Sequence, residues 1–137
     1  MLDMLAVLET LIGMAAQLAA KHAEVGSNRQ RFTESFEALL SFRSRPNSLE
    51  LLQARDRFYR SLAMVGGNKE LQAPLARMHA HLLRMQLSAM HEGLVTERFD
   101  DYVRIGEAVL TGNARKAELA ARRHVRATRG VLGHVSD

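Results

Sequence analysis

The sequence lacks cysteine altogether and contains little proline and few aromatic residues. Without cysteine, disulfides and cysteine-based zinc sites are excluded. Two prolines and 5% aromatic residues accompany a hydrophobic content of 47%. This balance favours helices over a β-sandwich or barrel. A chain of 137 residues fits one domain, which can bury roughly 70% of the surface that the unfolded chain exposes.

Secretory and membrane-spanning signals are missing as well. Asp3 and Glu9 interrupt the first apolar stretch and no basic segment precedes it, so a signal peptide is not expected. No uncharged apolar run reaches the length of a membrane span. Together with the absence of cysteine, these features predict a cytoplasmic protein without a membrane partner.

Apolar residues recur every three or four positions along nearly the whole chain, which predicts helices. Because the loops between them are short, neighbouring helices should pack antiparallel. The predicted fold class is all-α, an antiparallel bundle of about six helices that forms a single domain over residues 1–137. The expected helices run up to Gly26, from Ser27 to about Leu40, from about Leu49 to Met64, from about Asn68 to Met90, from roughly Glu97 to Leu110, and from Asn113 to about Leu132.

Polar residues predict where two of these helices begin. Ser27 with Gln30 resembles a capping box, in which two side chains satisfy free amides of the second helix. Asn47 with Glu50 is the start signal of the third helix. The stripe of the first helix consists of Leu2, Leu5, Leu8, Ile12, Ala15, Ala16 and Ala19, and that of the second of Phe32, Phe36, Leu39 and Leu40.

The fourth expected helix contains a proline and two histidines. Pro74 should kink this helix or delay its regular start, because proline removes a donor and clashes with the preceding turn. His79 and His81 lie about 200° apart around a helix, so they cannot both face one metal ion. We expect them at the surface or in a groove. The predicted apolar stripe consists of Leu71, Leu75, Met78, Leu82 and Met85.

The chain has a formal net charge of +4, and its basic residues are concentrated in the last expected helix. No aromatic residues alternate with the basic ones as stacking platforms, so a solvated or interface surface is favoured over a nucleic-acid interface. An acidic segment precedes the basic helix, and the two could neutralise each other or form an oligomer contact. The basic residues are Arg115, Lys116, Arg122, Arg123, Arg126 and Arg129, opposed in their helix by Glu118, and the acidic ones are Glu92, Glu97, Asp100, Asp101 and Glu107.

Signatures of enzymes are absent from the sequence: there is no glycine-rich phosphate loop, nucleophile elbow or HExxH motif. We therefore expect no enzyme. A helical enzyme remains an alternative that turnover of a bound ligand would reveal. Nucleic-acid binding by the basic last helix is a second alternative, which salt-dependent binding of a random duplex would reveal.

Three blocks of sequence resemble one protein family. The stretch RDRFYRSLA from Arg55, followed by GGN and Leu71, resembles the family pattern D-x-x-F-H-x-x-L … S-G-N-x-x-L. Two further blocks of the family appear in the same order. The first is Leu8-Glu9 with the later AAQLAA, and the second runs from Tyr102-x-x-Ile105 through Gly112-Asn113 to His124. The family is the ligand-sensing FCD domain of GntR transcription regulators, FadR subfamily.

The resemblance implies an antiparallel helical bundle with a central pocket for small effectors, often carboxylates. It also implies that the domain forms a homodimer. In the family this domain controls an N-terminal winged-helix domain that binds DNA. That module is absent from this chain, so DNA binding is expected only through a separate N-terminal domain. The implied function is effector sensing and homodimerisation in a transcription regulator. The alternative is a stand-alone small-molecule-binding or adaptor module, and a helix-turn-helix in the upstream coding sequence would discriminate the two.

The family commonly holds a divalent metal on one aspartate and three histidines, and this chain departs from that pattern. Arg55 occupies the aspartate position, Tyr59 and Tyr102 occupy two histidine positions, and only His124 is kept. We therefore predict no metal and no other cofactor. Arg55 would instead bind the effector carboxylate through a bidentate pair, and the two tyrosines and His124 would add hydrogen bonds. The alternative is a degenerate pocket in which Arg55 turns to solvent and pairs with a surface carboxylate.

Overall fold

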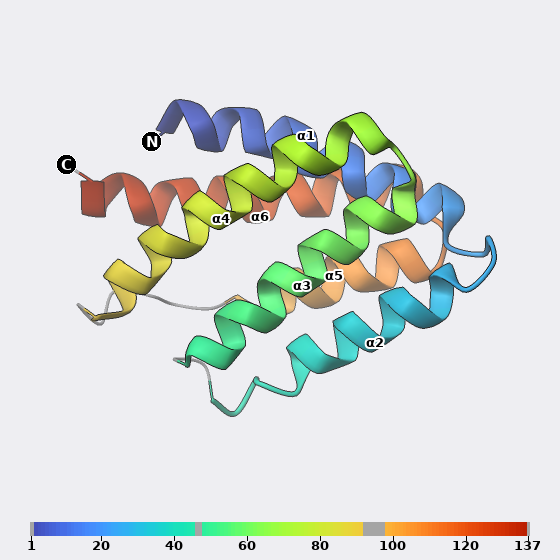
Figure 1. Ribbon diagram of the computed structural model, residues 1–137, viewed down its shortest axis with the longest axis horizontal. Coiled ribbons are helices and arrows are strands. Elements are labelled where there is room, and N and C mark those ends of the chain that lie inside the picture. The colour runs from blue at the N-terminus through green and yellow to red at the C-terminus, as the bar shows by residue number, and fades with distance from the viewer. Residues whose placement is uncertain (1, 46–47, 92–97, 137) are drawn as a thin grey trace.

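The computed structural model describes residues 2–45, 48–91 and 98–136, and the described residues confirm the all-α bundle. In Figure 1 the first and last helices run side by side in opposite directions, so both ends of the chain lie at one end of the molecule. The described residues contain no strand. They form the helices α1 (Leu2–His22), α2 (Asn28–Leu40), α3 (Leu49–Gly66), α4 (Lys69–His91), α5 (Phe99–Leu110) and α6 (Ala114–Ser136).

The predicted helix starts needed two corrections. The capping box at Ser27 is wrong: its backbone lies outside the extended region that a capping side chain requires, and Ser27 makes no side-chain cap hydrogen bond. The Gln30 amide instead donates to Glu34 at 3.3 Å. At α3 the N-cap is Ser48, whose Oγ accepts from the Leu51 amide at 3.1 Å. The predicted cap, Asn47, lies outside the described residues.

The predicted boundaries between the third and fourth helices and between the fifth and sixth helices are confirmed, and a glycine lies at each. Gly67 and Gly112 adopt φ of +75° and +72°, a left-handed conformation that glycine adopts without strain. Asn68 caps α4 by accepting from the Glu70 amide at 3.0 Å, and Asn113 caps α6 by accepting from the Lys116 amide at 3.1 Å. Pro74 does not delay the regular start of α4, since the helix is continuous from Lys69.

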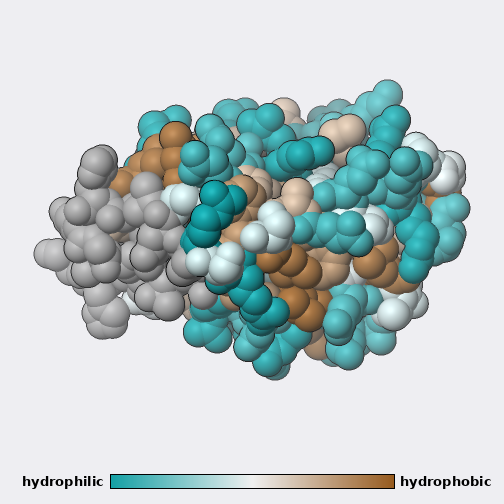
Figure 2. All heavy atoms as spheres, turned by 90° about the horizontal axis from the view of Figure 1, so that it is seen from below, coloured by the Kyte–Doolittle hydropathy of each residue, from teal (hydrophilic) through white to brown (hydrophobic). Residues whose placement is uncertain are grey.

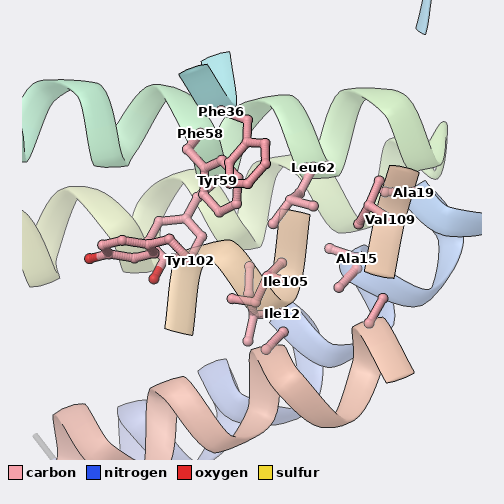
Figure 3. Packing of buried hydrophobic residues seen from close by; sticks show 14 of the residues in the cluster. Ile12, Ala15, Ala19, Phe36, Phe58, Tyr59, Leu62, Tyr102, Ile105 and Val109 are labelled. Carbon is pink, nitrogen blue, oxygen red and sulfur yellow. The ribbon is translucent and has the colours of Figure 1, made fainter. Parts of the chain in front are cut away.

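The core is one cluster to which all six helices contribute, and Figure 3 shows part of it. Of the predicted stripe of α1, only Leu2 is exposed. Phe36 of α2 covers α5 so closely that a Cβ on Gly106 would lie 2.2 Å from its ring. A side chain at position 106 would therefore have to displace the Phe36 ring. On the face in Figure 2, hydrophilic residues alternate with smaller apolar patches.

By length and composition, α1 is apolar enough to cross a membrane. In the structure its apolar stripe packs against α3, α4, α5 and α6. Leu5, Ile12 and Ala16 within that stripe are fully buried. The hydropathy of α1 is thus explained by its position as the central helix of the bundle.

A buried carboxylate joins the first and last helices. Glu9 of α1 is 6% exposed, and it accepts hydrogen bonds from Arg122 at 3.2 Å. Arg126 lies 3.0 Å and Arg129 3.7 Å from the same carboxylate. The Arg122 side chain crosses Gly13, where a Cβ would lie 2.7 Å from its Cγ. These three arginines of the basic helix therefore pair with a carboxylate of α1.

We predict that Glu9→Gln lowers the free energy of unfolding by roughly 2–3 kcal/mol, because it leaves partly buried arginines without their carboxylate. Urea unfolding followed by circular dichroism measures this loss. Glu37→Gln, at an exposed position of α2, is the matched control and should change stability by less than about 0.5 kcal/mol. Equal effects of the two substitutions would contradict the structural role of Glu9.

Candidate functional site

The four residues predicted to bind a ligand come from three helices and are all buried, and the rings of Tyr59, Tyr102 and His124 lie close together in the interior. Arg55 and Tyr59 lie on α3, Tyr102 on α5 and His124 on α6, and all four are buried. The His124 ring lies 4.8 Å from the Tyr102 ring and 6.4 Å from the Tyr59 ring, measured between centroids. Figure 3 shows both tyrosines at one end of the core, with their hydroxyls directed away from Ile12.

Arg55 is 6% exposed, so its side chain does not turn to solvent as the degenerate-pocket alternative supposed. Its neighbour Asp56 behaves differently, because a shift of one residue turns a side chain by about 100° around a helix. Asp56 pairs with Arg60 at 3.0 Å near the surface. The α3 helix therefore brings a positive charge into the interior at the position that the resemblance assigns to the family's aspartate.

Two further polar residues of α4 are buried, and sequence reasoning missed both. His79 is 5% exposed and stacks on Tyr59, with ring centroids 4.4 Å apart and planes 12° apart. Its prediction as a surface or groove histidine is wrong, whereas His81 is exposed as predicted. Gln86 is also 5% exposed. The buried positions of α4 are Leu71, Leu75, His79, Leu82, Gln86 and Ala89.

The spacing of those buried positions is the signal that could have revealed the two residues. They follow one another at intervals of four, four, three, four and three residues, which is the pattern of one helix face. The prediction placed Met78 and Met85 in this stripe because they are apolar. Both are only partly buried, since each precedes a stripe position by one residue and lies at its edge.

His79 is held neutral by its surroundings. Burial is the main cause that lowers the pKa of His79 to about 3, and the positive charge of Arg55 lowers it further. A hydrogen bond to the backbone of Leu75 opposes these effects without cancelling them. At neutral pH the His79 ring is therefore an uncharged partner of Tyr59, and Arg55 is the cation of this part of the interior.

Asp101 is the third buried polar residue that sequence reasoning missed, because it was assigned to an acidic surface. It is 3% exposed and lies 3.0 Å from His124 Nδ1. Arg98 donates to it at 2.7 Å and Arg104 at 3.2 Å. The hydrogen bond with His124 is the main cause that lowers the pKa of Asp101 to about 2.

This ionised carboxylate fixes the orientation of His124. A carboxylate only accepts hydrogen bonds, so Nδ1 of His124 must carry the proton that it donates. The ring is then held with Nε2 on the side opposite Asp101. The Asp101–His124 pair thus positions one ring nitrogen of α6 in the interior of the bundle.

The donor set of this region does not fit a divalent metal. A protein site for such an ion needs three or more nitrogen or oxygen ligands converging on one point. Among the described residues, no group of three or more His, Asp or Glu side chains is arranged in that way. Asp101 is already bonded to His124 and two arginines. Arg55 adds a positive charge that repels a cation.

Four pockets that the described residues line open at the surface. One of about 290 Å³ lies between α2 and α3, and one of about 400 Å³ lies against α6. A third, of about 410 Å³, is bordered by Arg43, Arg98 and Asp101. Neither these three nor a fourth near Gly67 is lined by Arg55, Tyr59, Tyr102 or His124.

The burial of His79 predicts a specific dependence of stability on pH. The unfolded chain takes up a proton on this residue below pH 6.5, whereas the folded chain does so only near pH 3. Stability is therefore lost as the pH falls through this window. We predict that His79→Gln makes the melting temperature less dependent on pH between 7 and about 4.5.

His81→Gln, which removes an exposed histidine from the same helix, is the control and should keep the pH dependence of the original chain. Thermal unfolding followed by circular dichroism at several pH values measures both variants. An unchanged pH dependence in His79→Gln would show that His79 is not buried in its neutral form.

Comparison with known proteins gives one family. The family model of the FCD domain matches residues 3–127, which is most of the chain. No curated protein matches the sequence in a search of such proteins. Domains of this family are regulatory and bind effectors, rather than catalysing a reaction. The chain belongs to the FCD domain family, the ligand-sensing C-terminal domains of GntR-type transcription regulators.

Proposed function

We propose that this domain senses a small organic acid and that Arg55 binds its carboxylate without the help of a metal. The observation that carries the proposal is the burial of Arg55 next to Tyr59 and His79, at the position where relatives have a metal-binding aspartate. A guanidinium has five N–H donors. It can keep contacts within the fold and still present two parallel donors to a carboxylate.

The surroundings of Arg55 favour an anion. A positive charge in a site that excludes water attracts a carboxylate more strongly than one in solvent does. Because His79 is neutral, it does not supply a second positive charge. Tyr59 and Tyr102 contribute phenol groups that donate hydrogen bonds to a ligand oxygen. His124, oriented by Asp101, contributes its Nε2 atom.

The proposed site is also placed to couple binding to the arrangement of helices. Its residues come from α3, α5 and α6, and α4 covers it through His79. Since these side chains pack on one another in the structure, an effector enters only if the helices separate. A ligand that binds the separated arrangement more tightly shifts the population toward it. In a homodimer, this shift would alter the placement of DNA-binding domains attached to the N-terminus in the cytoplasm.

We predict that Arg55→Met weakens the binding of an organic acid roughly 100-fold, because it removes two charge-assisted hydrogen bonds. Methionine keeps the length of the side chain, and circular dichroism checks that the variant folds. Acids that stabilise the original chain in a thermal-shift screen at pH 7 are then measured by calorimetry.

Arg57→Met is the matched control, since it removes the same charge from an exposed position of α3. It should leave the affinity within about threefold of the original, because an exposed charge acts weakly through solvent. A folded Arg55→Met variant that binds the same acids with unchanged affinity would refute the proposed role of Arg55.

A further inference from the structure

Gln86 of α4 has a buried amide oxygen for which the described residues provide no hydrogen-bond partner. The side chain is 5% exposed and occupies the same buried stripe as His79 and Leu82. A buried acceptor without a partner destabilises a fold, and an apolar residue of similar size would avoid this cost. The position is therefore suboptimal for packing alone.

Unlike Gln86, the buried His79 has partners within the fold. Its ring stacks on Tyr59, and a hydrogen bond to the backbone of Leu75 occupies one of its nitrogens. Both of its interactions explain why a histidine is accommodated in the core. No such internal explanation accounts for the amide oxygen of Gln86 within the described part of the chain.

The register of α3 against α4 places Gln86 near Arg55. The two helices run antiparallel (Figure 1), and the contact between Tyr59 and His79 fixes their relative position. Arg55 lies four residues before Tyr59, which is roughly 6 Å along α3. Gln86 lies seven residues after His79, which is roughly 10 Å along α4 in the same direction. Gln86 is thus about one helical turn beyond Arg55.

We propose that Gln86 accepts a hydrogen bond from a hydroxyl or amine of the effector whose carboxylate Arg55 binds. This inference rests on the proposed function of Arg55. The ligand is then an organic acid that carries a donor group a few carbon atoms from its carboxylate. An acid with a methyl group in place of the donor leaves the amide oxygen unpaired, and sites of this kind reject such analogues.

The first test needs no ligand. Gln86→Met replaces the amide with an apolar group of similar length, so the melting temperature of the ligand-free chain should rise by about 3 °C or more. Gln53→Met, at an exposed position of α3, is the control and should change it little. A fall in the melting temperature of Gln86→Met would overturn the inference, because the amide would then be satisfied within the fold.

The second test compares acids that differ in one group. The probes are γ-hydroxybutyrate with pentanoate and β-hydroxybutyrate with isovalerate, measured by calorimetry at pH 7. The hydroxy acid of at least one pair should bind the original chain about 10- to 100-fold more tightly than its methyl counterpart. Gln86→Met should remove this preference, whereas Arg55→Met should weaken both members of the pair.

The outcomes separate the two proposals. Binding that depends on Arg55 but shows no preference for the hydroxyl in either pair would overturn the role of Gln86 and leave the proposed function intact. A preference that survives in Gln86→Met would overturn it as well. If none of the four acids binds, the role of Gln86 is overturned, while the thermal-shift screen of acids still tests the proposed function. If the binding of an acid does not depend on Arg55, the proposed function fails and the role of Gln86 fails with it.

Discussion

The carboxylate of Glu9, buried between α1 and α6, is the interaction on which the arrangement of the bundle depends. It binds Arg122 and Arg126 of the last helix and thereby holds that helix against the central one. Gly13 leaves the space that the Arg122 side chain needs. Since α6 carries His124, the same contact fixes the position of His124 along the axis of the bundle. A buried charge needs its partner close by, so these helices cannot slide independently.

The interior site combines two opposite charges on separate helices. Asp101 is ionised and holds His124 from one side, while Arg55 supplies a positive charge from α3. His79 stays neutral between Tyr59 and Arg55 because burial opposes its protonation. This arrangement differs in kind from a metal centre, in which carboxylate and imidazole groups share one cation. In the proposed account a fixed guanidinium takes over the attraction for an acidic ligand.

The sequence predicted the helices well because apolar spacing and glycine turns are local signals. Asn113 begins the last helix as predicted, whereas Ser27 does not cap the second, since its backbone conformation depends on the turn before it. The proximity of Tyr102 and His124 followed from the resemblance to a family, because no local pattern shows which helices meet. His79 and Gln86 were missed for a physical reason. A polar residue at a buried position breaks the apolar pattern of its helix, so the sequence alone assigns it to the surface.

The central claim is that Arg55 binds the effector without a metal, and one measurement tests it most directly. An acid identified by thermal shift is titrated by calorimetry into the protein before and after treatment with EDTA, with metal content measured in the same samples. The account predicts the same affinity before and after chelation. Loss of binding with EDTA, restored by zinc or nickel and abolished by His124→Ala, would contradict it.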